Sequence, residues 1–126
     1  MRQKTITKYE KYKQEDFLDG ACNVFASAFK ARHPRSEIWC YTTEGFPIDG
    51  LIHCFCVLDG MYYDALGCRG SDLDWLFESY EQLEDYEMEK LSSDELFDFN
   101  MEYLSFDRYS HILNQAKYIL KKLNLY

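Results

Sequence analysis

Apolar residues crowd the segment after residue 19, where they recur around most of a helical circumference. This pattern predicts a buried helix rather than one with a broad solvent face. We expect the helix to begin near Gly20, with Asp19 as its N-cap. It should end before Pro34, because the residue that precedes a proline is disfavoured in helical geometry. Its apolar positions are Ala21, Cys22, Val24, Phe25, Ala26, Ala28 and Phe29.

The clearest local pattern is that of a β-hairpin. Two β-rich runs, residues 51–58 and 61–66, are joined by Asp59-Gly60, a dipeptide that the type I′ hairpin turn favours. Gly67 and Gly70 are expected to close the second strand.

Cap and turn residues predict the remaining elements. They are a strand at 38–42, a loop at 43–50, a helix from a Ser71/Asp74 capping box to about Leu83, and a short strand at 86–91. A helix over 94–101, capped by Ser92 or Ser93, and a last helix, capped by Ser105 or Asp107, follow. The last helix has an apolar stripe of Ile112, Leu113, Ala116, Leu120 and Leu123.

The order of these elements, a helix, then several strands, then helices, indicates an α+β fold. We expect a central helix packed on a small antiparallel sheet, with helices at the C-terminal end. The chain has 126 residues, of which 47% are hydrophobic and 17% aromatic. That is enough to bury the core of a single domain over residues 1–126.

Charge is distributed unevenly along the chain, whose formal net charge is -8. Residues 72–107 carry thirteen acidic side chains against the single base Lys90. Such a segment repels phosphate, so general nucleic-acid binding is not expected. The simplest interpretation is a solvated surface, and the functional alternative is a patch for a basic partner or a mimic of nucleic acid.

The first 17 residues are charged and lack the apolar core of a secretory signal. No apolar run approaches the roughly 20 residues of a membrane span. We therefore expect a cytoplasmic protein that does not associate with membranes and whose five cysteines are reduced. Most of these cysteines are expected to be small buried hydrophobes.

Cys22 differs from the other cysteines because it lies in the first turn of the predicted helix. A cysteine is nucleophilic as thiolate, and the positive end of a helix dipole favours a negative sulfur. The unpaired N–H groups of that turn can also receive an oxyanion during acyl transfer. The others fall in predicted strands (Cys40, Cys54 and Cys56) or after the Gly67 turn (Cys68).

His53 is the candidate base for Cys22. His33 lies at the other end of the predicted helix, roughly 16 Å away at the helical rise per residue. His111 lies on the last helix, where a partly exposed histidine is the simpler interpretation. His53 opens the first hairpin strand, and alternation places Phe55 on its face and Cys54 on the opposite face.

Asp64 is the candidate partner of His53. A two-residue turn pairs Leu58 with Met61, Phe55 with Asp64 and His53 with Leu66, so Asp64 lies diagonally from His53 on the same face. An aspartate in an apolar run is costly to bury without a partner, and it would fix the tautomer of the imidazole. Each of the three residues has a simple structural explanation, but their joint placement predicts a nucleophile–base–orienter triad.

A metal site is the competing interpretation. Cys54 and Cys56 with His53, Cys22 or Cys68 offer sulfur and nitrogen ligands. Strand alternation separates His53 from both hairpin cysteines, however, and the chain has no C-x-x-C pair. We therefore expect neither a metal nor another cofactor.

Cys22, His53 and Asp64 in this order resemble the papain-like and transglutaminase-like thiol superfamily. Locally, DGACNVFASAF (19–29) and HCFCVLDGMYYDALG (53–67) look like a group of small bacterial and phage proteins. These have G-x-C before an apolar helix, then a histidine strand, a D-G turn and Y-x-D-x-x-G. The likeness, which covers about residues 19–67, implies a papain-like fold. In that fold Cys22 would be the nucleophile, His53 the general base and Asp64 its orienter.

The chain departs from these patterns at two positions. Papain-type enzymes commonly place an oxyanion-donating glutamine six residues before the cysteine, where this chain has Asp16, and Gln14 is the nearest glutamine. The histidine that commonly follows the cysteine in the bacterial and phage group is Asn23 here. The candidate oxyanion or substrate-lining residues are Gln14, Gly20, Ala21 and Asn23.

Two hypotheses about function follow. The first is a small cysteine hydrolase or acyl transferase whose substrate is an amide, isopeptide or thioester on a peptide or other acyl compound. The second is a catalytically silent binding or inhibitor protein of phage type, which would engage a protein partner or ligand through an acidic and aromatic surface. The 11 tyrosines and 9 phenylalanines favour the second, and the placement of Cys22, His53 and Asp64 favours the first.

Overall fold

The fold is α+β, as predicted, with one five-stranded antiparallel sheet among the described residues. The computed structural model describes residues 14–18, 21–43, 51–80 and 86–126. The helices are η1 (Gln14–Phe17, a 3-10 helix), α2 (Cys22–Arg32), α3 (Asp74–Ser79), α4 (Ser93–Tyr103) and α5 (Phe106–Lys122). The strands are β1 (Glu37–Thr42), β2 (Leu51–Leu58), β3 (Met61–Asp64), β4 (Gly67–Gly70) and β5 (Glu87–Leu91), in the spatial order β4-β3-β2-β1-β5.

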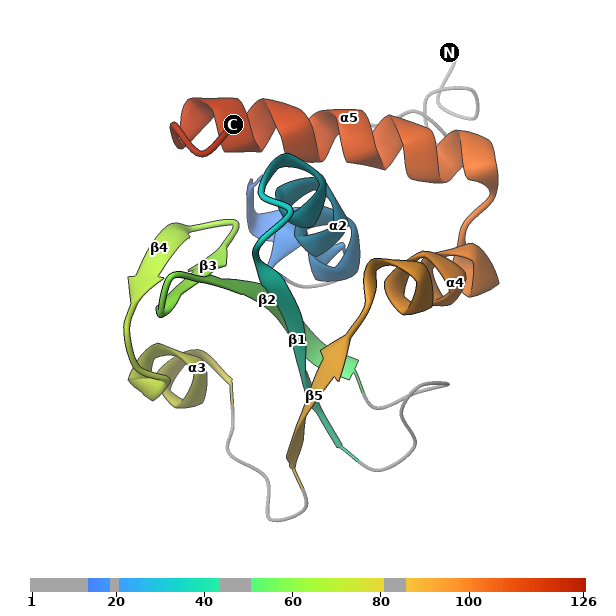
Figure 1. The fold of residues 1–126 in the computed structure, drawn as a ribbon. Coiled ribbons are helices and arrows are strands. Elements are labelled where there is room, and N and C mark those ends of the chain that lie inside the picture. The colour runs from blue at the N-terminus through green and yellow to red at the C-terminus, as the bar shows by residue number, and fades with distance from the viewer. Residues whose placement is uncertain (1–13, 19–20, 44–50, 81–85) are drawn as a thin grey trace.

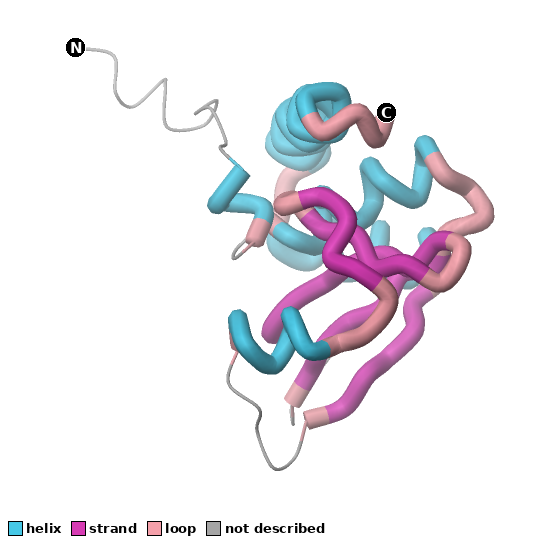
Figure 2. The backbone as a smooth tube through the Cα atoms, turned by 90° about the vertical axis from the view of Figure 1, so that its left-hand side faces the viewer, coloured by secondary structure: helices cyan, strands magenta, loops and turns pink. Residues whose placement is uncertain are grey.

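The elements form layers around two apolar cores. Helix α2 lies between the sheet and the long helix α5 (Figure 1). The larger core fills this side of the sheet, while α3 covers a smaller aromatic cluster around Tyr41, Phe55 and Trp75. A view turned by 90° shows α3 well apart from α5, which lies at the top of the molecule (Figure 2). On α3, Trp75 packs inward against Phe55, and Phe77 packs inward against Tyr41.

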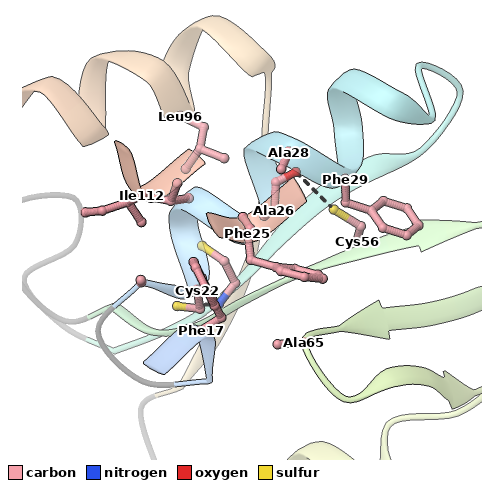
Figure 3. Packing of buried hydrophobic residues seen from close by; sticks show 14 of the residues in the cluster. Phe17, Cys22, Phe25, Ala26, Ala28, Phe29, Cys56, Ala65, Leu96 and Ile112 are labelled. Atoms are coloured by element: carbon pink, nitrogen blue, oxygen red, sulfur yellow. Dashed lines mark hydrogen bonds between the residues drawn. The ribbon is translucent and has the colours of Figure 1, made fainter. Parts of the chain in front are cut away.

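Helix α2 is buried on most of its surface, as its apolar sequence predicts (Figure 3). Phe29 stacks on Tyr63 with ring centroids 5.0 Å apart, and the thiol of Cys56 donates to the carbonyl of Ala26 (3.5 Å). The predicted start of the helix is wrong by two residues. Cys22 is the first helical residue and Ala21 is the N-cap, with no side chain capping it.

The hairpin turn is confirmed, but the second strand is shorter than predicted. Asp59 and Gly60 both have positive φ, 51° and 78°, as a type I′ turn requires, and Leu58 pairs with Met61. Pairing of β2 with β3 runs to Cys56–Tyr63. It stops before the predicted partners of Phe55 and His53, because the chain turns back directly after Asp64.

Contrary to the sequence prediction, Gly67 and Gly70 do not close the second strand. They are the first and last residues of a further strand, β4. β4 returns alongside β3, so Asp64 pairs with Gly67 across the new turn. Gly67 has a φ of 99°, a conformation that glycine adopts without strain. Gly67 and Gly70 therefore mark the second strand of another hairpin, and Cys68 and Arg69 lie on that strand.

The C-terminal helices have the predicted serine caps. Ser92 and Glu95 form a reciprocal capping box on α4, and Ser105 accepts from the backbone N–H of Arg108 on α5. The capping box predicted for α3 is wrong. Its N-cap is Leu73, and an Asp72 oxygen accepts from the backbone N–H of Asp74.

Other predictions lie partly or wholly outside the described residues. They include Asp19, Gly20, most of the 43–50 loop and the end of the helix predicted to reach Leu83. The described acidic side chains of the 72–107 segment are exposed, except for the half-buried Glu89. No described helix combines the length and apolar composition that crossing a bilayer requires.

A buried polar network joins α4 to the start of α2. The amide of Asn23 donates to Asn100, whose own amide donates to the hydroxyl of Ser27 (3.3 Å). Asn100 is fully buried. Buried amides are costly to leave unpaired, so this network fixes how α4 lies against α2.

Replacing Asn100 by alanine should lower the free energy of unfolding by about 1–3 kcal/mol, since it leaves the Asn23 amide buried without its acceptor. Urea denaturation gives the value. Asn114→Ala, at an exposed position of α5, is the matched control and should change it by less than about 0.5 kcal/mol. Equal effects of the two substitutions would contradict a stabilising role for the network.

Candidate functional site

Cys22 stands at the start of α2, as the sequence predicts. As the first helical residue, it belongs to the turn at the positive end of the helix dipole, where the N–H groups of Val24 and Phe25 are bonded to the carbonyl of Ala21. Its side chain is almost fully buried, and its Sγ accepts from the backbone N–H of Cys54 (3.3 Å). The sulfur therefore meets two sources of positive electrostatic potential, the helix terminus and a strand N–H.

The contact with Cys54 shows where the sulfur lies relative to the sheet. Backbone N–H groups of a strand point sideways, within the plane of the sheet. One side of β2 at this point is occupied by β1, since Cys54 pairs with Cys40. The sulfur thus lies at the opposite edge of β2, beyond the last β2–β3 pair, Cys56–Tyr63.

This edge position lets one sulfur interact with both faces of the sheet. Strand alternation directs the thiol of Cys54 to the α2 face, and the ring of His53 to the aromatic face beside Phe55. Cys54 belongs to the larger core, while His53 contacts Phe55 (ring centroids 6.2 Å) and Trp75 (6.1 Å). Cys22 nevertheless interacts electrostatically with both side chains.

His53 is fully buried, with both ring nitrogens in polar contacts. Nε2 lies 3.0 Å from Oδ2 of Asp64, and Nδ1 lies 3.2 Å from the hydroxyl of Tyr80. The Tyr80 ring also stacks on the imidazole, with centroids 4.8 Å apart. The imidazole is therefore fixed in place by an acidic partner, by the Tyr80 hydroxyl and by the rings of Phe55, Trp75 and Tyr80.

Asp64 is equally buried and is bonded through both carboxylate oxygens. Oδ1 accepts from the backbone N–H of Leu66 (2.9 Å), which closes the turn after β3. Oδ2 accepts from His53 and from Nη1 of Arg69 (2.8 Å). The guanidinium of Arg69 lies over the Trp75 ring at 4.7 Å, so a cation–π contact holds it beside Asp64.

These contacts fit a doubly protonated His53. The carboxylate of Asp64 can only accept, so Nε2 must donate to it. The hydroxyl of Tyr80 donates its single proton to the carbonyl of Leu18 (2.7 Å), and it therefore offers a lone pair to Nδ1. An imidazolium has a proton on each nitrogen and satisfies both neighbours.

The pKa values point in the same direction. Burial by itself would lower the pKa of His53, but the hydrogen bond with Asp64 and the electrostatic interaction with Cys22 raise it to about 9. A hydrogen bond with the Cys54 thiol, together with His53, holds the pKa of Cys22 well below its ordinary value against the effect of burial. Burial also opposes ionisation of Asp64, but His53, the Leu66 N–H and Arg69 hold its pKa below the usual range.

Cys54 has the opposite character to Cys22. Hydrogen bonds with Cys22 and Cys40, and burial, raise the pKa of Cys54 well above that of a free thiol. Its Sγ lies 3.1 Å from that of Cys40. All five cysteines are free, and Cys68 is the exposed one. Cys54 therefore stays protonated and can donate to the sulfur of Cys22.

A cavity of about 430 Å³ adjoins Cys22. It lies between the start of α2 and the consecutive helices α4 and α5. Its lining consists of Asp16, Ala21, Cys22, Asn23, Val24, Leu51, Phe99, Tyr103, Leu104, Arg108 and Ile112. The nucleophile candidate thus forms part of the wall of a space large enough for a small ligand.

The predicted oxyanion and lining residues separate into three groups. Ala21 and Asn23 line the cavity, although the Asn23 amide is bonded to Asn100. Gln14 donates from its amide to the carbonyl of Ala65 (2.5 Å), and it is not among the lining residues. Gly20 lies outside the described residues.

The remaining histidines lie elsewhere, as expected. Nε2 of His33, which caps the C-terminal end of α2, is 2.5 Å from the carbonyl of Leu125. His111 is half-buried on α5. Within the described part of the chain, no cluster of three or more His, Cys, Asp or Glu side chains is placed to hold a metal ion.

Sequence reasoning missed Arg69, Tyr80 and Cys54 as members of the site. A basic residue close after a buried aspartate was a usable signal for Arg69, once Gly67 and Gly70 are interpreted as the ends of a strand. No local signal marks Tyr80, whose contacts reach Leu18 and His53. Cys54 was assigned to the core by alternation, correctly, but its backbone N–H faces Cys22.

Comparison of the chain with models of protein families, with characterised proteins and with solved structures found no match.

Replacing Cys54 by alanine should raise the apparent pKa of Cys22, because the substitution removes a thiol donor and leaves the backbone N–H in place. The pH dependence of Cys22 alkylation, followed by mass spectrometry, measures the change. Cys56→Ala is the matched control, since Cys56 is as deeply buried on the same strand and donates to Ala26 instead. A Cys22 pKa that is the same in both variants and in the wild type would contradict this role of Cys54.

Proposed function

We propose that this protein is a small cysteine hydrolase or acyl transferase of papain-like type. The observation that carries the proposal is the buried His53, which is bonded to Asp64 through Nε2 while its interaction with Cys22 lowers the pKa of that thiol. A pair with a raised imidazole pKa and a lowered thiol pKa provides a nucleophile and a proton donor at neutral pH.

In the proposed reaction Cys22 acts as the nucleophile and His53 transfers the protons. The Cys22 thiolate attacks the carbonyl carbon of the substrate and forms a C–S bond. The bond to the leaving group then breaks, and the leaving group takes the Nδ1 proton of the His53 imidazolium, whose Nε2 stays bonded to Asp64. In the second half, neutral His53 removes a proton from water or another acceptor, which attacks the thioester and releases the Cys22 thiolate.

Two features support the charge development that this scheme requires. The positive end of the α2 dipole, beside Cys22, favours a developing oxyanion, although the N–H groups of Ala21 and Val24 are already bonded to carbonyls. Asp64 holds His53 by Nε2 and stabilises the imidazolium, while Arg69 keeps the carboxylate ionised. Amides, isopeptides and thioesters all fit this chemistry, in peptides or in other acyl compounds.

A second candidate is a binding protein without turnover. It is favoured by large apolar side chains exposed on the two C-terminal helices, among them Phe97, Tyr103 and Phe106, with 39%, 56% and 65% of their surface exposed. Such side chains are common at protein interfaces. This candidate requires neither a nucleophilic Cys22 nor a paired His53.

The pH dependence of iodoacetamide labelling at each cysteine tests the proposal. In the wild type Cys22 should label with an apparent pKa well below the free-thiol value of about 8.5. In His53→Ala the pKa should rise, because the imidazolium that stabilises the thiolate is lost. His111→Ala, with far-UV circular dichroism to check the fold of both variants, is the matched control.

Turnover of activated esters and thioesters then separates catalysis from mere reactivity. Cys22→Ser should abolish acyl transfer, and His53→Ala should slow it by about 10²–10⁴-fold. A Cys22 pKa near that of a free thiol in the wild type would contradict the proposal. If the Cys22→Ala variant still forms a stable complex with a partner, and the wild type transfers no acyl group, the binding-protein candidate replaces the enzyme proposal.

A further inference from the structure

We propose that the cavity beside Cys22 binds the apolar acyl group of the substrate, an assignment that rests on the proposed function and specifies its substrate class. At about 430 Å³, the cavity falls within the range of small-molecule sites. Cys22 is among the lining residues, so the assignment puts the carbonyl carbon of a bound acyl group next to Cys22. The rest of the acyl group then extends between α4 and α5.

Most of the lining residues that come after α2 in the sequence are apolar. Leu51 from the start of β2, Leu104 from the α4–α5 connection and Ile112 from α5 contribute aliphatic surface. Phe99 and Tyr103 add two aromatic rings whose centroids are 5.2 Å apart. Burying apolar atoms of a ligand against these side chains is favourable in proportion to the area removed from water.

The polar groups of the lining do not favour a charged ligand. Asp16 and Arg108 are its charged residues, one acid and one base, so their formal charges cancel. The amide of Asn23 is bonded to Asn100 and is therefore already satisfied. A neutral apolar group suits this surface better than an anion or a cation, because each of these would be attracted by one of the two charged residues and repelled by the other.

The cavity also explains why the C-terminal helices belong to the site. Nucleophile, base and orienter all come from residues 22–64, yet five of the eleven lining residues come from residues 99–112. The Asn23–Asn100 hydrogen bond ties the two parts together at the nucleophile. Helices α4 and α5 thus act as the element that selects the acyl group.

The kinetics of Cys22 acylation by p-nitrophenyl esters of increasing chain length test the assignment. The value of kcat/KM should rise by roughly fourfold per added methylene from acetate toward hexanoate, as expected for burial of one CH₂, and then level off when the cavity is full. A parallel series, the p-nitrophenyl esters of N-acetyl-glycine, N-acetyl-leucine and N-acetyl-phenylalanine, presents the apolar group as a side chain.

A variant with a smaller cavity sharpens the test. Leu104→Trp should remove most of the preference for hexanoate over acetate, with the ratio of the two rates within the same variant as the readout. Leu125→Trp is the matched control, because Leu125 is half-buried but does not line the cavity. It should keep the preference for hexanoate.

The outcomes separate this inference from the proposed function. A preference for hexanoate over acetate supports it and identifies an alkyl acyl group. A preference for the leucyl or phenylalanyl ester over the glycyl ester supports it and identifies an apolar residue of a peptide. Acylation of Cys22 at equal rates in both series overturns the cavity assignment alone. Absence of Cys22 acylation with every ester overturns the proposed function.

Discussion

The hydrogen bond between Asp64 and His53 is the interaction on which the rest of the site depends. Both side chains are almost fully buried, where an unpaired carboxylate or imidazolium would be strongly unfavourable. The carboxylate is therefore given three partners: His53, the guanidinium of Arg69 and the backbone N–H of Leu66. The first sets the charge of the imidazole, the second ties β4 to the site, and the third closes the turn between β3 and β4. One buried acid thus shapes both the backbone around it and the proton affinity of its neighbour.

The short β3 strand has a second consequence for the site. Since pairing with β2 stops at Cys56–Tyr63, the edge of β2 near Cys54 is open to the sulfur of Cys22. There the sulfur accepts from the backbone N–H of Cys54. It also interacts with the Cys54 thiol and with His53, which lies on the far face of the sheet. A longer β3, as the sequence predicts, would cover this edge. The turn that shortens the strand is the one that Asp64 closes, so the same residue fixes the base and leaves room for the nucleophile.

Much of this arrangement could be predicted from the sequence, because it follows from local rules. The two-residue periodicity of strands and the Asp59-Gly60 turn place Asp64 near His53, and the apolar helix with Cys22 at its start precedes them. The details that failed depend on contacts between distant residues. Helix α2 begins at Cys22 rather than near Gly20. The strand ends at Asp64 because its carboxylate binds the next turn. Tyr80 reaches His53 from the end of α3. Neither propensity nor spacing encodes such contacts, and the cavity formed with α4 and α5 likewise requires the tertiary fold.

The most direct test of this account is an NMR titration of His53, with the imidazole nitrogens observed between pH 5 and pH 10. If the buried ion-pair network is correct, both ring nitrogens stay protonated through neutral pH and the ring loses a proton near pH 9. Asp64→Asn, which removes the negative partner, should lower that pKa. A single protonated nitrogen at pH 7, with a His53 pKa at or below the ordinary value of about 6.5, would contradict the central claim that Asp64 and Cys22 hold a charged imidazole in the interior.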